Sequence, residues 1–181
     1  MSEKRREELL EVLTHLRVNA IYAKKKHANA ADRKHRYATF LRVSSVLLSS
    51  VAGSFFLGFV SGLASDSNAL ALVGAGLALA GAVLAALDQV FQWDKQAEAH
   101  ASASGRMLRL VTATALLRAQ SSDPTFDDES LAEALERLAG EYHDVQEDAD
   151  RFYRTSSGDY RKARQGISDG EDSLTPEERA L

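Results

Sequence analysis

Residues 45–87 read SVLLSSVAGSFFLGFVSGLASDSNALALVGAGLALAGAVLAAL, and this stretch decides the fold. Its single charged residue is Asp66, so that 23 uncharged residues follow Arg42 and 21 precede Asp88. Helices of these lengths extend roughly 30 to 35 Å, which matches the hydrocarbon core of a bilayer at about 30 Å. The length of both runs therefore favours two membrane spans.

A helical hairpin buried inside a soluble protein is the alternative. Helices that are apolar on every side need other elements around them. The remaining helices expected for this chain are amphipathic, with charge at most other positions, and cannot enclose two such helices. We therefore predict transmembrane helices at 43–65 and 69–90, joined by an outer turn at 66–68.

Charge divides the 181-residue chain into three segments around these spans. Residues 1–42 carry 11 basic and 5 acidic side chains, whereas residues 88–181 carry 11 basic and 20 acidic ones. Basic residues close to a span favour the cytoplasmic side of the membrane. Here the outer turn has no basic residue, whereas the other ends of the two spans are flanked by Arg33, Lys34, Arg36, Arg42 and Lys95. Both termini are therefore predicted to be cytoplasmic.

Residues that typically anchor a span at the membrane interface cluster on the same side as the basic residues. The predicted anchors are Tyr37, Phe40, Arg42, Phe91 and Trp93. Asp88 ends the second span and marks its inner boundary, where an acid can pair with a cation or line a water path. Simple exposure at the interface is the interpretation that we favour for Asp88.

Small residues recur at every fourth position within both spans. The first row is Ser50, Ser54, Gly58 and Gly62, with Ser61 on the same face, and the second is Gly74, Ala78, Ala82 and Ala86. Such rows let helix backbones approach closely, because helices in lipid associate through packing. The rows serve either packing within the hairpin or, since polar groups in a span avoid lipid, contact with other subunits or with water in an assembled pore.

Outside the spans, residues 1–42, 91–120 and 126–154 show the apolar spacing of amphipathic helices, with a turn at 121–124. Three facing stripes predict a cytoplasmic three-helix bundle that continues the transmembrane hairpin, so the fold class is an all-α membrane protein. We expect the basic first segment to pack against the acidic third one. Residues 155–181 lack an apolar period and are expected to be a disordered tail.

No catalytic, cofactor-binding or metal site is predicted. The chain has no cysteine, which excludes disulfides and thiolate ligands. Its histidines never lie four residues apart, and His27 falls on an apolar stripe, where a packed structural histidine is favoured over a metal ligand. Lys24, Lys25 and Lys26 lack interleaved aromatic residues, so we expect a solvated or ion-paired face and no nucleic acid.

A basic N-terminal helix, a two-span hairpin with a very short outer turn, and the stretch FQWDKQAEAHASASGRMLRL at 91–110 together resemble the SLATT family, the SMODS and SLOG-associating two-transmembrane effectors. The pattern is carried by Trp93, Lys95, Ala97, His100 and Leu108. The resemblance implies a membrane effector of bacterial anti-phage or nucleotide-signalling conflict systems, located in the inner membrane. It also implies activation in trans by a cytoplasmic partner or a nucleotide signal.

The expected function is therefore an oligomerising effector that permeabilises the inner membrane on activation, with the lipid bilayer and further copies of the chain as partners. A passive two-span anchor or scaffold that recruits a cytoplasmic partner is the alternative. Replacing both spans by unrelated apolar helices would preserve the function of an anchor and abolish that of a pore. No constellation of residues supports an enzyme.

Overall fold

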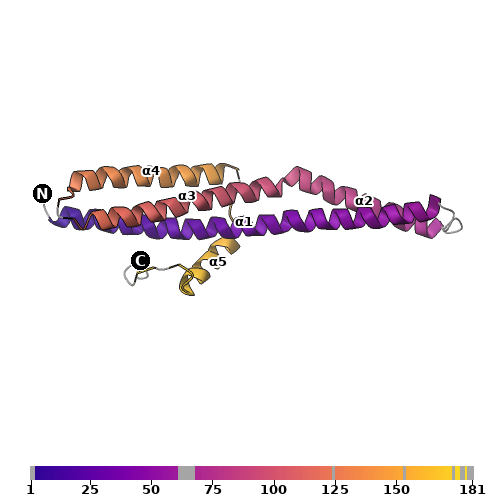
Figure 1. Ribbon diagram of the computed structural model, residues 1–181, viewed down its shortest axis with the longest axis horizontal. Coiled ribbons are helices and arrows are strands. Elements are labelled where there is room, and N and C mark those ends of the chain that lie inside the picture. The colour runs from indigo at the N-terminus through magenta and orange to yellow at the C-terminus, as the bar shows by residue number, and fades with distance from the viewer. Residues whose placement is uncertain are drawn as a thin grey trace. The chain divides into compact units, whose positions relative to one another are not determined.

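A computed structural model describes residues 3–60, 68–123, 125–152, 154–172, 174–175 and 178. The helices are α1 at Glu3–Val60, α2 at Asn68–Phe91, α3 at Trp93–Gln120, α4 at Asp128–Phe152 and α5 at Ser157–Ser168 (Figure 1). No β-strand occurs among the described residues, which confirms the all-α class. Residues 66 and 67 of the predicted outer turn lie outside the described residues, and Asn68 already belongs to α2.

Helix α1 is 58 residues long and runs without a break from the basic N-terminal segment into the first apolar run. This continuity agrees with the sequence, because both prolines, at 124 and 176, lie outside α1. Contacts nevertheless divide the chain into two compact units. We call Met1–Asp32 with Gln96–Leu181 the bundle unit, and Arg33–Lys95 the hairpin unit.

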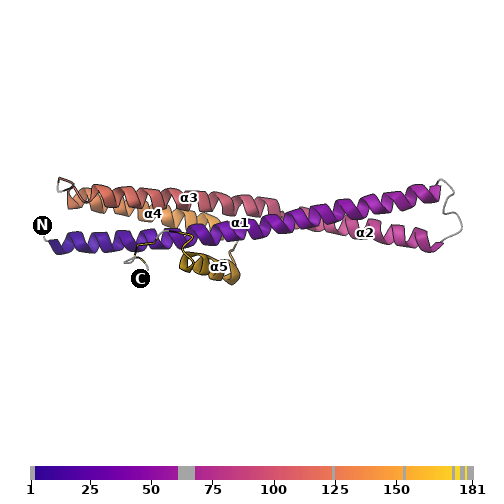
Figure 2. The same cartoon turned by 60° about the horizontal axis from the view of Figure 1, so that its bottom comes forward.

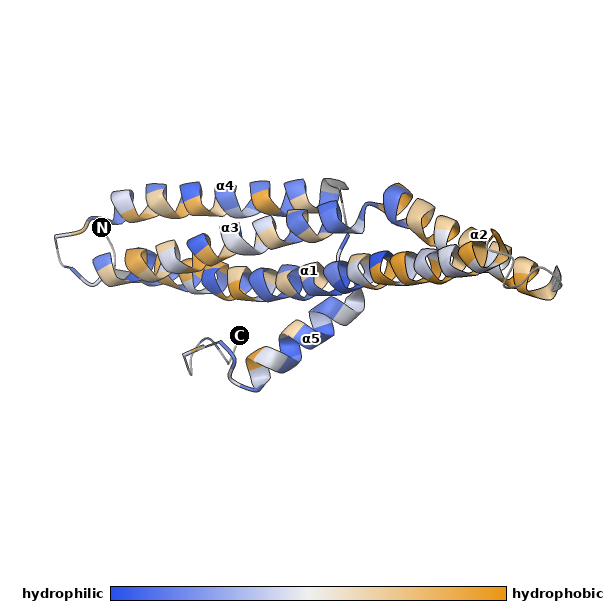
Figure 3. Ribbon diagram, turned by 45° about the vertical axis from the view of Figure 1, so that its right-hand side comes forward, coloured by the Kyte–Doolittle hydropathy of each residue, from blue (hydrophilic) through white to orange (hydrophobic). Residues whose placement is uncertain are grey.

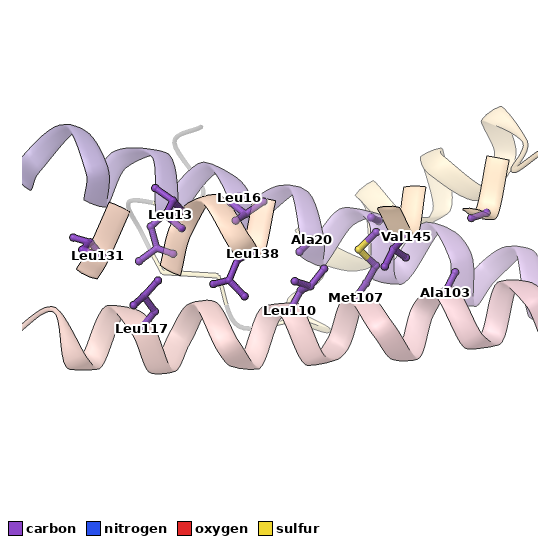
Figure 4. Close-up of a cluster of buried hydrophobic side chains, with 13 residues drawn as sticks. Leu13, Leu16, Ala20, Ala103, Met107, Leu110, Leu117, Leu131, Leu138 and Val145 are labelled. Atoms are coloured by element: carbon purple, nitrogen blue, oxygen red, sulfur yellow. The ribbon is translucent and has the colours of Figure 1, made fainter. Parts of the chain in front are cut away.

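The core of the bundle unit is formed by the N-terminal half of α1 together with α3 and α4. Buried side chains from the three helices meet in one cluster, shown in Figure 4, which includes Leu13, Leu16, Met107, Leu110, Leu117, Leu131, Leu138 and Val145. Each fully buried leucine stabilises the fold by about 1.5–3 kcal/mol relative to an exposed one. The apolar stripes of the three helices are therefore the main source of stability in this unit.

The C-terminal segment corrects the expectation of a disordered tail, because Ser157–Ser168 form helix α5. A capping box begins this helix: the Asp159 N–H donates to Ser156 Oγ (3.2 Å), and the Ser156 N–H donates to Asp159 Oδ2 (2.8 Å). The buried face of α5 includes only one large apolar residue, Ile167. Helix α5 therefore lacks the long leucine stripe by which a sequence pattern is detected.

Helix α5 and the residues after it pack on a second face of α1. Ile167 and Leu174 form a separate small cluster with Val18 and Ile21 of α1. Within the described residues, the bundle unit thus contains α5 as a packed helix in addition to the three helices predicted from the apolar stripes.

Ion pairs also hold the C-terminal segment to α1. Lys24 pairs with Asp172 (2.5 Å) and Lys25 with Glu171. A third pair joins Arg17 to Glu178, whose side chain is completely buried (2.9 Å). The basic first segment packs against acidic α4, as expected, and Arg6 pairs with Asp128 at the start of that helix (2.8 Å). The three cations above, however, pair with the tail and not with α4. The tail is therefore a structural part of the bundle unit.

In the hairpin unit, the C-terminal part of α1 and α2 lie side by side (Figures 1 and 2). Figure 3 shows that both are coloured predominantly as apolar. The described part of the first predicted span ends with α1 at Val60, and residues 61–65 lie outside the described residues. The second span corresponds to α2, which ends at Phe91, one residue beyond the predicted boundary.

Candidate functional site

The apolar surface of the hairpin unit is the candidate functional site. In the part of the chain that the structure describes, two helices are long and apolar enough to cross a membrane. In their most apolar stretches only 6% and 11% of the residues are buried. Large side chains such as Leu57 and Leu72 are 68% and 73% exposed. A surface this apolar and this exposed requires lipid or other helices to cover it.

The contact between α1 and α2 is made by small residues that the sequence did not single out. Ser45 Oγ donates a hydrogen bond to the Gly81 carbonyl (2.9 Å). A Cβ atom on Gly81 would lie 2.9 Å from Ser49 Oγ and 3.4 Å from the Ser45 carbonyl oxygen. Ala52 is buried one turn further along α1. The hairpin therefore closes on a row formed by Ser45, Ser49 and Ala52.

Gly74 makes the second close approach between the two helices. A Cβ atom at this position would lie 3.1 Å from the Cβ of Phe55. Together with Ala78 and Ala82, Gly74 lines an apolar groove of about 600 Å³ between α1 and α2. Three members of the predicted second row thus face α1, whereas the fourth, Ala86, is exposed and does not line the groove.

The predicted row on the first span has a different position. Ser50 and Ser54 are exposed, outside the groove, and their hydroxyls donate to backbone carbonyls of their own helix, Val46 at 2.8 Å and Ser50 at 3.0 Å. Gly58 is half-buried, with open space where a Cβ atom would lie. Ser61 and Gly62 lie outside the described residues. The Ser50–Ser54 face is therefore left uncovered by α2.

Most of the predicted interfacial anchors gather where α2 ends. Trp93 stacks on Phe91, with ring centroids 4.8 Å apart, and Tyr37 packs against Trp93 at 6.0 Å. The Arg42 guanidinium pairs with Asp94, and this hydrogen bond raises the pKa of Arg42. Phe40 is the exception, because it stays 68% exposed. The aromatic rings and the charges thus form one cluster within the hairpin unit.

Asp88 is half-buried and its carboxylate lies 3.7 Å from the Arg42 guanidinium. It therefore has a cationic neighbour, whereas we favoured simple exposure for it. The backbone turns at Gln92, whose φ is 49° and whose N–H donates to the Asp88 carbonyl (2.9 Å). This left-handed residue separates α2 from α3 and sets the position of Trp93.

A buried histidine pair lies in the bundle unit. His27 Nδ1 lies 3.1 Å from His100 Nδ1, and the rings are stacked with centroids 5.3 Å apart. Burial, followed by the charge of Lys26, lowers the pKa of His27 to about 4. No group of three or more His, Cys, Asp or Glu side chains that could hold a metal ion occurs within the described part of the chain. His27 is thus a packed, neutral residue of the core, stacked on His100.

Comparison with known families matches residues 9–178 to a family model described as "SMODS and SLOG-associating 2TM effector domain family 4". Comparisons with curated proteins and with solved structures gave no match. The matched range includes both apolar helices and also α5, which the sequence pattern had not revealed.

Proposed function

Because the chain belongs to family 4 of the SMODS and SLOG-associating two-transmembrane effector domains, we propose that this membrane protein oligomerises through its hairpin and permeabilises the inner membrane when activated. The association named in the family description supports a role in a bacterial conflict system, such as anti-phage defence by abortive infection. Activation would come in trans, from a cytoplasmic partner or a nucleotide signal.

One observation carries the oligomerisation proposal: the face with Ser50 and Ser54 is exposed and lies outside the α1–α2 contact. Small residues mark surfaces where helices meet in a membrane, because they let the backbones approach closely. Since α2 does not cover this face, the face is free to pack against a neighbouring copy of the hairpin or to line a water-filled pore. The face thus supports assembly into a pore.

The distribution of basic residues supports an arrangement in which the bundle unit is cytoplasmic, as a helical bundle that receives the signal. Cytoplasmic flanks of membrane spans carry an excess of lysine and arginine. Arg33, Arg36 and Arg42 precede the first span and Lys95 follows the second. In this orientation, both termini are cytoplasmic and the hairpin enters the membrane from the inner side.

The proposal is tested by inducing the protein in bacteria, together with its neighbouring gene products, and following a potential-sensitive dye. Wild-type protein is expected to depolarise the cells. Ser50→Leu with Ser54→Leu fills the uncovered face, and a loss of about 1.4 kcal/mol in assembly reduces the fraction of open pores about tenfold. Ala80→Leu is the matched control, because Ala80 is exposed on α2 and outside the groove. It should depolarise as wild type does.

Unchanged membrane potential and viability with the wild-type protein would overturn the pore. A second test exchanges both spans for unrelated apolar helices of equal length. If function survives this exchange, the hairpin is a passive anchor that recruits a partner, and the pore is excluded.

A further inference from the structure

A polar groove of about 570 Å³ lies in the bundle unit, lined by α1, α4 and α5. Its polar and aromatic lining includes Tyr22 and Lys26 from α1, Tyr142 and Gln146 from α4, and Tyr160 and Arg164 from α5. Figure 2 shows α5 beside α1 in this unit. The volume lies in the range of about 300–1,000 Å³ that is typical of small-molecule sites.

Aromatic rings form one part of the groove. Tyr22 and Tyr160 are stacked, with ring centroids 6.3 Å apart and planes inclined by 25°. Tyr142 contributes a third ring from α4, and its hydroxyl accepts a hydrogen bond from Gln146 Nε2 (3.0 Å). Tyrosine faces bind planar rings by stacking, and this contact tolerates different ring types.

Positive charge forms the other part. Among the described residues that line the groove there is no Asp or Glu, although the chain as a whole has a net charge of −4. Lys26 and Arg164 form no ion pair within the described part of the chain, whereas the neighbouring Lys24 and Lys25 pair with the tail. Two cations without a carboxylate in a concave site attract and hydrogen-bond an anion.

From these features we propose that the groove is a binding site for a small anion joined to a planar ring, with a nucleoside monophosphate as a fitting example. The ring extends the Tyr22–Tyr160 stack by packing on Tyr160, which is 49% exposed, and the phosphate contacts Lys26 and Arg164. This site rests on the proposed function in one respect, activation by a nucleotide signal, to which it gives a place in the bundle unit. Binding is measured without any membrane opening, so a failure to bind and a failure to form a pore are distinguishable.

The test uses the full chain, purified in detergent, and isothermal titration calorimetry with four probes: AMP, phenyl phosphate, inorganic phosphate and adenosine. AMP and phenyl phosphate carry both a ring and an anion, and are expected to bind at one site per chain. Inorganic phosphate and adenosine each offer only half of the contacts, so both should bind at least about tenfold more weakly than AMP.

Variants locate the site. Lys26→Gln and Arg164→Gln are each expected to weaken AMP binding about tenfold, because each removes one charged hydrogen-bond donor. Lys26→Arg keeps the charge and should retain binding. Arg161→Gln and Lys162→Gln are matched controls, since both residues are exposed on α5 outside the groove, and neither should change the affinity.

A second readout does not depend on any variant. A ligand that contacts α1, α4 and α5 together should slow amide hydrogen exchange in Ser157–Ser168 when AMP is added. The proposal is overturned if neither AMP nor phenyl phosphate binds below about 1 mM. Equal affinity for AMP and inorganic phosphate, or unchanged AMP affinity in Arg164→Gln, also excludes it.

Discussion

His27 is a buried residue whose protonation opposes folding. Burial of the ring lowers its pKa from 6.5 to about 4, the charge of Lys26 and the His100 ring act in the same direction, and Asp159 opposes them. A pKa lower in the folded than in the unfolded protein means that the unfolded chain takes up the proton first. Stability is therefore full above about pH 6.5 and is lost as the pH falls towards 4, by at most about 1.4 kcal/mol per pH unit.

Thermal unfolding of the detergent-solubilised protein, followed by circular dichroism across this pH range, measures the effect. His27→Gln has no ionisable ring, so its melting temperature should vary less with pH than that of the wild type. His143→Gln, at an exposed position on α4, should keep the wild-type dependence. An equally steep loss of stability in His27→Gln would contradict the assignment to this residue.

Gln92 adopts a backbone conformation that favours glycine, with φ at 49°. The left-handed region costs a non-glycine residue about 1 kcal/mol. Gln92→Gly is therefore expected to raise the free energy of unfolding by up to about 1 kcal/mol. Gln89→Gly, at an exposed helical position in α2, should instead lower it by about 1 kcal/mol. Chemical unfolding in detergent compares the two variants, and a destabilised Gln92→Gly would show that φ at this position is not the constraint.

Single residues show what sequence reasoning can reach. The apolar stripe predicted that His27 is packed inside the bundle, and it is buried against His100. The partner could not be predicted, because the two histidines are 73 positions apart and their meeting depends on how α1 and α3 are aligned. Likewise, the left-handed conformation of Gln92 could not be predicted, because a glutamine in the sequence does not reveal its own φ angle.

At the scale of elements, the close approach at Gly81 predicts opposite effects for two chemically identical substitutions. Gly81→Ala places a methyl group 2.9 Å from Ser49 Oγ and is expected to push α1 and α2 apart, at a cost of about 1–3 kcal/mol. Gly76→Ala meets no atom within 4 Å and gains about 1 kcal/mol of helix propensity. Thermal unfolding in detergent should rank Gly76→Ala above wild type and Gly81→Ala below it. Equal melting temperatures would mean that the two helices do not pack at Gly81.

Helix lengths followed from the sequence, but helix rotation did not. Uncharged runs and apolar stripes gave the ends of α2, α3 and α4 to within a few residues, because both signals end where the helices end. Each span, however, carries several small residues at spacings of three and four, and spacing alone does not say which row faces the partner. The row with Ser50 was singled out, while Ser45 and Ser49 make the contact. Helix α5 was missed because it is only 12 residues long and buries few large side chains.

At the scale of the whole molecule, the absence of cysteine makes the orientation directly measurable. Ser67→Cys, in the predicted outer turn, should react in intact cells with a thiol reagent that does not cross the inner membrane. Ser122→Cys, exposed in the turn after α3, should react only after the membrane is opened. These outcomes follow from the excess of basic residues on one side of both spans. Labelling of Ser122→Cys in intact cells would contradict the predicted orientation, with both termini cytoplasmic.

The family match confirms the resemblance first indicated by Trp93, His100 and the short outer turn. This resemblance could be found from the sequence because it depends on two uncharged runs of similar length between a basic and an acidic segment. Such a pattern is visible without knowing how the helices are aligned or rotated against one another. Features that depend on alignment between helices, such as the aromatic groove and the tail contacts, appear only once the helices are placed within the bundle unit.

The C-terminal segment has a practical consequence for anyone who shortens this protein. By composition the last 27 residues resemble a dispensable tail, yet Ile167 and Leu174 cover Val18 and Ile21, and Glu178 neutralises Arg17. Deleting them would expose apolar side chains of α1 beside cations that have lost their acidic partners. Such a truncated protein is expected to aggregate, and its loss of activity would say nothing about the hairpin.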